Sequence, residues 1–382
     1  MERIYLDHAA TTPLDKEILD KMLPYLTDCY GNADSPHAHG RKAMGAVDNA
    51  RDTIAELLGA KPNEVYFTSG GTESDNWALF GGAYAMKEQG RDEVIVSAIE
   101  HHAVLAAAEK LRKDGFSVCY LPVNGQGRVE TKALQEMISP RTAIVAVMSV
   151  NNETGVAQPI KELTEIAHGV GALFFTDGVQ SAPHTPINVK ELGVDMLSIS
   201  SHKFYGPKGS GVLYVKGGVK IKPWIVGGEQ ERGLRGGTTN VAAVVGMAAA
   251  YQKTVAHVSQ TNEKMQTLRA AFVDGLSGID GLHIYGGDIF SGDIPSVLSL
   301  RIEEVTGVDL VYKLDLCGIS ISAGAACASA SVKPSHVMMA MGLTEGQARE
   351  CVRISFGKGN TLDEVQKAAA LLKDTVEKLR KN

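Results

Sequence analysis

Paired cysteines, an excess of basic charge and long apolar runs are all missing from this sequence of 382 residues. The five cysteines form no CxxC spacing and their number is odd, which speaks against a disulfide framework and a zinc finger. Lys and Arg number 38 against 44 Asp and Glu, a net charge of −6, whereas nucleic-acid binding needs a basic excess. Apolar stretches such as residues 142–150 stay far below the roughly 18 residues of a membrane span, and no signal peptide is recognisable. We therefore expect a cytoplasmic protein without nucleic-acid or membrane partners.

Glycine is the one residue type in clear excess, with 41 of 382 residues. Hydrophobic residues make up 44% and charged residues 21%, as in ordinary globular proteins with a large core. The length allows two or three domains. The glycines therefore need an explanation beyond ordinary turns.

Short apolar runs alternate with longer amphipathic runs, which is typical of βαβ units and a mostly parallel sheet. We expect strands at residues 65–68, 94–97, 117–122, 142–150, 172–176, 196–200 and 211–215, with helices at 72–87, 103–112, 132–138 and 160–168 between them. A single helical pattern at residues 241–276 is long enough to bridge two domains.

The pattern of apolar and polar residues changes after residue 282. Strands are expected there at 283–285, 297–302 and 319–322, and a helix at 309–316. Thr344 with Gln347 and Thr361 with Glu364 match capping boxes, the second opening a helix to about residue 380. The fold class is α/β. We predict a large domain at residues 15–250, with a mostly parallel central sheet flanked by helices, and a smaller α+β domain at residues 1–14 and 251–382.

Polar residues stand directly after several expected strands, where open α/β sheets bind ligands. At residues 67–73 a strand runs through Gly70 and Gly71 into a helix beginning near Thr72. Backbone N–H groups and a hydroxyl at a helix N-terminus can hold a phosphate, although a plain glycine turn is an equal alternative. No GxxxxGK[ST] loop is present.

Asp177 and Lys203 each follow a strand and stand 26 residues apart, about one βαβ crossover. Taken singly, Asp177 ends an apolar run, where a buried carboxylate needs a cation, with a helix N-cap as the alternative, and Lys203 is more often a surface lysine. Together, a carboxylate for a pyridinium nitrogen, a desolvated amine and a phosphate cradle are the features that bind pyridoxal phosphate. No GxGxxG follows a strand, so nothing indicates a nicotinamide cofactor.

Three further positions are candidates. His101 and His102 are adjacent, but HExxH is absent, so a ring stacked on the pyridine is favoured over a metal site, with His101 preferred. Cys327 stands among small residues in an expected loop and is the favoured accessible nucleophile, with Cys317 a minor rival, whereas Cys119 and Cys351 are expected in the core. Arg353 could bind a substrate carboxylate, although a surface arginine is the more ordinary reading.

Residues 5–13, 68–76 and 200–209 and the stretch around Cys327 closely resemble the cysteine desulfurases of the NifS/IscS type. These are fold-type I pyridoxal-phosphate (PLP) enzymes of the class V aminotransferase superfamily, and the resemblance runs through nearly the whole chain. It implies a homodimer and a sulfurtransferase that converts L-cysteine to L-alanine, leaves a persulfide on Cys327 and passes the sulfur to an acceptor protein such as an iron–sulfur scaffold.

The resemblance also implies a role for each matching residue. Lys203 would hold PLP covalently, Asp177 would pair with the pyridine nitrogen, Gln180 would bind the phenolic oxygen and His101 would stack on the ring. Asn152 and Arg353 would hold the substrate carboxylate. The phosphate would be held by Gly71, Thr72, Ser200 and His202, and by Thr238 from the other subunit.

Two departures from the family qualify these expectations. Ala323, Ala325 and Ala328 replace hydroxyl residues that commonly surround the cysteine, which puts the hydrogen bonding of that stretch in question. The sequence also ends soon after the helix expected at residues 361–380, without the tail that docks a scaffold in housekeeping members. The sulfur acceptor is thus unassigned.

The leading hypothesis is a PLP-dependent cysteine desulfurase that supplies iron–sulfur or thio-cofactor assembly. Selenocysteine lyase activity or another class V reaction is the nearest alternative, in which Cys327 would matter less. A catalytically silent sulfur-carrier scaffold is the third. The joint presence of Lys203, Asp177 and Cys327 speaks against it, since a silent protein has no chemical need for all three.

Overall fold

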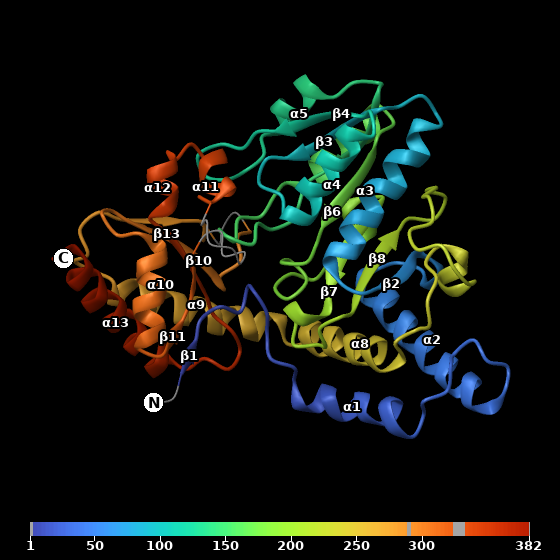
Figure 1. Cartoon of the computed structure of the whole chain (residues 1–382), viewed down its shortest axis with the longest axis horizontal. Helices are drawn as coiled ribbons and strands as arrows, with labels where there is room; N and C mark the ends of the chain where they lie inside the picture. Colours follow the sequence, from blue (N-terminus) through green and yellow to red (C-terminus); the bar gives the residue numbers. More distant parts are fainter. Residues whose placement is uncertain (1–2, 289–291, 324–332, 382) are drawn as a thin grey trace.

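The computed structural model describes residues 3–288, 292–323 and 333–381, which form a larger and a smaller lobe (Figure 1). A central sheet flanked by helices builds the larger lobe, and a separate antiparallel sheet builds the smaller one. The predicted fold class is confirmed.

Within the described residues, the large sheet has seven strands in the order β2-β8-β7-β6-β5-β3-β4. Neighbours are parallel except around β8, which runs antiparallel to both β2 and β7. Most strands are apolar and buried on both faces, as expected for a sheet covered by helices. Their bounds are β2 (Val65–Thr68), β3 (Glu93–Ser97), β4 (Ser117–Leu121), β5 (Thr142–Ala146), β6 (Leu173–Asp177), β7 (Met196–Ser200) and β8 (Gly211–Val215).

Helices cover the two faces of this sheet and form a separate core on each. One core joins the sheet to α1 (Lys16–Thr27), α2 (Ala38–Leu58), α5 (Thr131–Met137), α6 (Ile160–Gly169), α7 (Val189–Leu192) and α8 (Val241–Ala256). The other joins it to α3 (Gly71–Lys87) and α4 (His102–Lys113). Short 3-10 helices occupy Pro62–Glu64 (η1), Ser201–Lys203 (η2) and Gln230–Gly233 (η3).

The small lobe contains an antiparallel sheet of order β12-β13-β10-β9 and its own apolar core. The strands are β9 (Leu282–Tyr285), β10 (Val297–Ile302), β12 (Ser322–Ala323) and β13 (Cys351–Ser355), and the helices are α9 (Val258–Gly275), α10 (Gly307–Leu316), α11 (His336–Ala340), α12 (Glu345–Arg349) and α13 (Leu362–Arg380). The N-terminal strand β1 (Ile4–Tyr5) pairs in parallel with β11 (Ile319–Ser320). The domain boundaries at residues 14/15 and 250/251 stay a prediction.

Both predicted capping boxes are confirmed, at the starts of α12 and α13. The single helix predicted at residues 241–276 is wrong. His257 leaves the helical conformation with φ −118° and ψ 12°, so α8 ends before it and α9 begins after it. The break directs the apolar residues of α9 into the small-lobe core, while α8 packs in the large lobe.

Two predicted strands also need correction. The strand predicted at residues 142–150 ends at Ala146. The single strand predicted at residues 319–322 is two short strands in different sheets, β11 beside β1 and β12 beside β13. Across the described part of the chain, no helix combines the length and apolarity needed to cross a bilayer.

Candidate active site

The carboxyl ends of the central strands open into a cavity of about 850 Å³, the front cavity, which the small lobe closes from the opposite side. Its lining brings together most of the predicted site residues: Gly71, Thr72, His101, Asn152, Asp177, Gln180, Ser200, His202, Lys203 and Arg353. Thr238 lines a different cavity, and Cys327 lies outside the described residues.

Lys203 lies at the end of η2, directly after β7. Its Nζ donates to the carbonyl oxygens of Ala9 at 2.5 Å and Ala10 at 2.9 Å. Desolvation, followed by the charge of Arg353, lowers the pKa of Lys203 to about 8, against the opposing carboxylates of Asp177 and Asp7. About one tenth of the amine is therefore neutral near pH 7 and able to attack a carbonyl carbon, far more than for an ordinary lysine.

Asp177 ends β6, the strand beside β7, and is paired in register with Ser198. Burial raises the pKa of its carboxyl group to about 6, while the Val179 N–H, which donates to Oδ1 at 2.8 Å, and the charge of Lys203 act in the opposite direction. The prediction that neighbouring strands bring Asp177 and Lys203 to one sheet edge is borne out by this geometry. A buried carboxylate of this kind needs a cationic partner, which a protonated pyridine nitrogen would provide.

A cluster of small residues surrounds the start of α3. The chain passes from β2 through Gly70, whose φ of +150° favours glycine, into a helix that begins at Gly71. A Cβ on Gly71 would lie 2.9 Å from Cγ2 of Val179, so the close packing requires glycine there. The turn, Thr72 and Ser200 lie together in the cavity wall, and N–H groups at a helix N-terminus are suited to an anion; we call this group the cradle.

His101, His202 and Gln180 are among the imidazole and amide side chains that line the same cavity. His101 caps α4, and its Nδ1 accepts the Ala103 N–H at 3.2 Å, so the neutral ring carries its proton on Nε2. Desolvation, followed by the charge of Lys203, lowers the pKa of His101 to about 4. His202 Nδ1 lies 3.1 Å from the Thr11 hydroxyl, and Gln180 Nε2 donates to the Ala9 carbonyl at 2.9 Å.

Arg353 reaches the cavity from β13 and is nine-tenths buried. Its Nη1 donates to the Asn152 carbonyl at 3.0 Å and its Nη2 to Asp7 Oδ1 at 2.8 Å. Among the residues that the structure describes, Nε has no acceptor although it is buried. An unpaired guanidinium N–H in a cavity wall is suited to a carboxylate ligand.

Thr238 is exposed and lines a neighbouring cavity of about 210 Å³. Ser69 and Gly209 line both this cavity and the front cavity. Within one chain, Thr238 is therefore close to the phosphate cradle without belonging to it. Arg235 is held nearby by an ion pair of 2.8 Å with Glu73.

A second cavity of about 330 Å³, the rear cavity, lies behind the lysine. Ala9, Gln180 and Lys203 line both cavities and thus form the wall between them. The hydrogen bonds from Lys203 and Gln180 to the Ala9 carbonyl hold this wall together.

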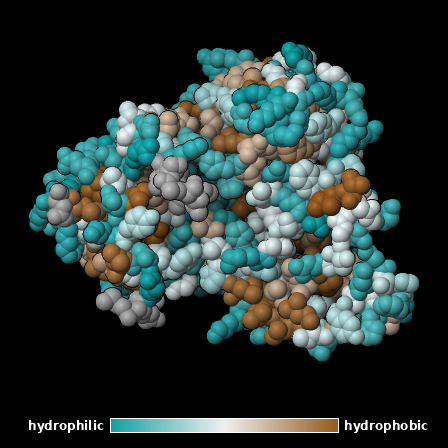
Figure 2. All heavy atoms as spheres, in the orientation of Figure 1, coloured by the Kyte–Doolittle hydropathy of each residue, from teal (hydrophilic) through white to brown (hydrophobic). Residues whose placement is uncertain are grey.

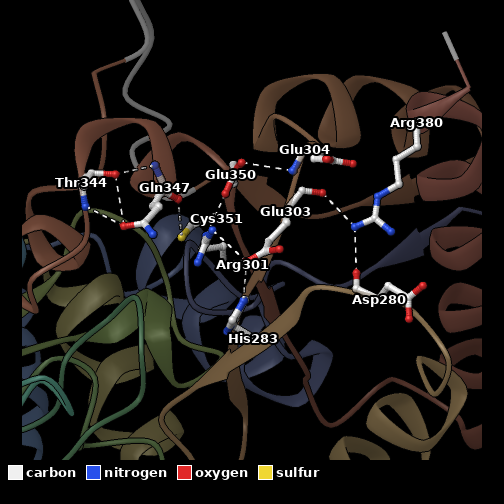
Figure 3. Close-up of polar contacts among 10 residues, drawn as sticks. All are labelled: Asp280, His283, Arg301, Glu303, Glu304, Thr344, Gln347, Glu350, Cys351 and Arg380. Carbon is white, nitrogen blue, oxygen red and sulfur yellow. Dashed lines mark hydrogen bonds and ion pairs between the residues drawn. The ribbon is translucent and has the colours of Figure 1, made fainter.

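The described cysteines differ in accessibility. Cys351 is buried, as predicted, and Figure 3 shows its thiol facing the main chain of Gln347, to whose carbonyl oxygen it donates at 3.4 Å. Burial raises the pKa of this thiol to about 12, which makes it unreactive near neutral pH. Cys119 is only half-buried, against the core position predicted for it, because β4 is the edge strand of the sheet.

The sequence interpretation missed several acids that line or approach the front cavity. Asp7 pairs with Arg353, and Asp75 accepts a hydrogen bond of 2.6 Å from Ser198, the residue that pairs in register with Asp177. Burial raises the pKa of Asp75 well above its ordinary value, and burial raises that of Glu100 to about 8. Only their position beside motif residues could have indicated them. In the described residues no group of three or more His, Cys, Asp or Glu could hold a metal ion.

A parallel sheet with a lysine, a buried acid and an anion cradle at its carboxyl edge defines a transferase of the pyridoxal-phosphate type. The chain belongs to the aminotransferase class-V family, whose profile matches residues 4–368.

Relatives within this family are similar over nearly their whole length. The cysteine desulfurase IscS of Methanosarcina thermophila is 42% identical over 99% of this chain and 93% of its own. Among solved structures, a NifS-like protein is 36% identical with a TM-score of 0.91 over both complete chains. SspA in complex with cysteine is 34% identical with a TM-score of 0.82, over 92% of this chain and 98% of its own. The resemblance to the NifS/IscS type is confirmed.

Proposed function

We propose that the protein is a PLP-dependent cysteine desulfurase, a sulfurtransferase that converts L-cysteine to L-alanine and a protein persulfide. The observation that carries this proposal is the meeting of Lys203, Asp177 and the Gly70–Gly71 cradle in one cavity. The names of its full-length relatives support the choice of reaction within the family.

The residues of the front cavity fit the cofactor. Lys203 would hold it covalently, Asp177 would face its ring nitrogen, Gln180 would bind its phenolic oxygen and His101 would cover the ring. Gly71, Thr72, Ser200 and His202 would hold the phosphate, together with Thr238 of a second subunit. When bound, PLP supplies an electron sink for the pair released at the substrate Cα.

The substrate would be oriented by its carboxylate, on the free N–H of Arg353 and the amide of Asn152. The Lys203 amine, released when the substrate amine takes its place, would remove the Cα proton. The Cys327 thiolate would then attack the substrate sulfur, so that an S–S bond forms, the C–S bond breaks and the electron pair stays with carbon. Protonation of that carbon and return of a proton to Cα would give L-alanine, and the Cys327 persulfide would pass its sulfur to an acceptor protein, for iron–sulfur cluster or thio-cofactor assembly.

The test measures alanine and sulfide after L-cysteine and a reductant are added to protein loaded with PLP. Lys203→Ala should lose both the visible absorption band of the bound cofactor and turnover. Cys327→Ser should keep the band and form almost no sulfide, whereas Cys351→Ser, the control, should retain sulfide formation. Undiminished sulfide release by Cys327→Ser would contradict the persulfide route, and wild-type protein without the band would contradict the cofactor.

We also propose that the enzyme is a homodimer, because Thr238 would complete the cradle of the other subunit. Exposed apolar side chains support this: Figure 2 shows hydrophobic residues gathered on the surface over α1, where Leu19, Leu23 and Leu26 are exposed. Val226, on the same connection between β8 and α8 as Thr238, is 91% exposed. Light scattering should give the mass of two chains, and an active monomer would refute the shared site.

A further inference from the structure

Glu73 lines the front cavity but has no role in the proposed function. It lies in the first turn of α3, beside the cradle, and its side chain is only 10% exposed. A negative charge next to a site for an anion is unfavourable unless a cation offsets it. Arg235 supplies that cation from the connection between β8 and α8, which covers residues 216–240.

Both oxygens of the Glu73 carboxylate are in use. Arg235 Nε donates to Oε1 at 2.8 Å and Nη2 donates to Oε2 at 3.1 Å, so the guanidinium binds as a fork. The Ser69 N–H, in the turn before α3, donates to Oε2 at 2.7 Å. Burial acts to raise the pKa of Glu73, but the hydrogen bonds from Arg235 and Ser69 outweigh it and lower this pKa below its ordinary value. The charged carboxylate therefore joins the turn of the cradle to the connection.

The part of the connection that carries Arg235 is closely packed. The Gly236 N–H donates to the Ile225 carbonyl at 2.8 Å, and a Cβ on Gly236 would lie 2.8 Å from Cα of Gly227. The exposed Thr238 follows two residues after Gly236. Because the backbone next to Arg235 has little room to move, the place of Arg235 constrains the place of Thr238.

We propose that Glu73 and Arg235 are positioning residues that hold a subunit's own cradle and the Thr238 that it offers to its neighbour as one unit. The inference rests on the proposed function, in which the PLP phosphate fills the cradle and Thr238 reaches the other subunit. The ion pair would then strengthen the coupling between PLP binding and subunit association. Such coupling is reciprocal, so that each equilibrium favours the other.

Two substitutions separate the geometry of the pair from its charge. Arg235→Gln removes the fork and the charge, whereas Arg235→Lys keeps the charge and loses the fork. In the apoprotein, hydrogen exchange followed by mass spectrometry should become several-fold faster in residues 68–71 and 236–239 of both variants. The acceptor of the Ser69 N–H is then no longer held in place. This measurement needs no cofactor.

The coupling is measured with PLP. Absorbance titration of Arg235→Gln should give a Kd for PLP about tenfold above that of the wild type, the size expected for a lost charge-assisted hydrogen bond. Sedimentation should show that PLP lowers the dissociation constant of the dimer less in this variant than in the wild type. A purely structural defect would weaken the dimer equally with and without PLP.

Lys222→Gln is the matched control. Lys222 lies on the same connection and pairs with Glu88, directly after the other end of α3, so this ion pair joins the same two segments. Both side chains are exposed, and loss of the pair should leave exchange in residues 68–71 and the Kd for PLP unchanged.

Melting temperatures verify that each variant folds. Wild-type exchange in residues 68–71 of both Arg235 variants would overturn the inference. It would also be overturned if Arg235→Lys matched the wild type throughout, because the charge alone would then be sufficient. Failure of the proposed function would appear differently, as wild-type protein that binds no PLP or stays monomeric.

Discussion

Gly211→Ala should damage the cofactor site although Gly211 does not line the front cavity. Gly211 begins β8 and pairs with Thr68 on one side and Ser200 on the other. A Cβ at this position would lie 2.6 Å from Cα, 2.7 Å from C and 2.9 Å from N of Gly70. These are backbone atoms, which cannot rotate away, so the turn before α3 has to move.

The size of the effect follows from this overlap. Forcing one extra carbon into a filled space costs about 1–3 kcal/mol of the free energy of unfolding. A displaced cradle would also lose the proposed phosphate contacts, and each 1.4 kcal/mol of lost binding is about tenfold in Kd. We therefore expect the Kd for PLP to rise about tenfold or more.

The matched control is Gly45→Ala, which makes the same chemical change in the exposed interior of α2. No atom lies within 4 Å of the added carbon there, and alanine is the better helix former by about 1 kcal/mol. This variant should be slightly more stable and bind PLP like the wild type. Absorbance titration with PLP and denaturant unfolding measure both quantities. If Gly211→Ala matched the wild type in its Kd for PLP and in its free energy of unfolding, the reasoning from backbone contact would be refuted.

Three further predictions follow from the charges and thiols of the site. Asp7→Asn should lower the pKa of Lys203 below about 8, because the Asp7 carboxylate raises the pKa of that amine. The acid limb of PLP loading should therefore move to lower pH. Movement of this limb to higher pH would contradict the prediction. Asp177→Asn should stabilise the apoprotein at pH 7 by roughly 1–3 kcal/mol. Burial raises the Asp177 pKa to about 6, so in the wild type the folded state loses stability as the pH rises from about 4 to 6. Denaturant unfolding should show that this gain disappears below about pH 4, and an equal gain at both pH values would argue for a packing effect instead. Cys351 in the folded wild type should resist iodoacetamide at pH 7, because burial raises the pKa of its thiol to about 12; rapid labelling seen by mass spectrometry would show that the thiol is accessible.

Most strands of the large sheet could be predicted to within a residue or so, because burial on both faces leaves a mostly apolar run; the strand predicted at residues 142–150, which ends at Ala146, is the exception. Val65–Thr68, Met196–Ser200 and Gly211–Val215 have the predicted bounds. The break at His257 could not be predicted, since neither glycine nor proline marks it and its cause is the separate core that α9 joins. No assignment was made for residues 16–58, where α1 and α2 lie.

Residues near strand ends were predictable as site candidates because chain topology alone brings them together. Asp177 and Lys203 are of this kind. Asp7 and His336 are not, since they reach the front cavity from segments far away in sequence, through β1 and α11. Asp7 meets Arg353 only when distant segments of the small lobe pair, and His336 meets the Glu100 carbonyl only when the two lobes are placed together.

The pairing of the N-terminal strand with distant segments has a consequence for the order of folding. Ile4 pairs with Ile319, the Ala9 N–H donates to the Ser355 hydroxyl, and Asp7 meets Arg353. Such contacts close loops of more than 300 residues, and they cannot form on a ribosome until the partner segments have been synthesised. Residues 4–9 emerge early and reach their final contacts late, so a nascent chain can hold a nearly complete large lobe while the side of the front cavity that Asp7 and Arg353 form is still open.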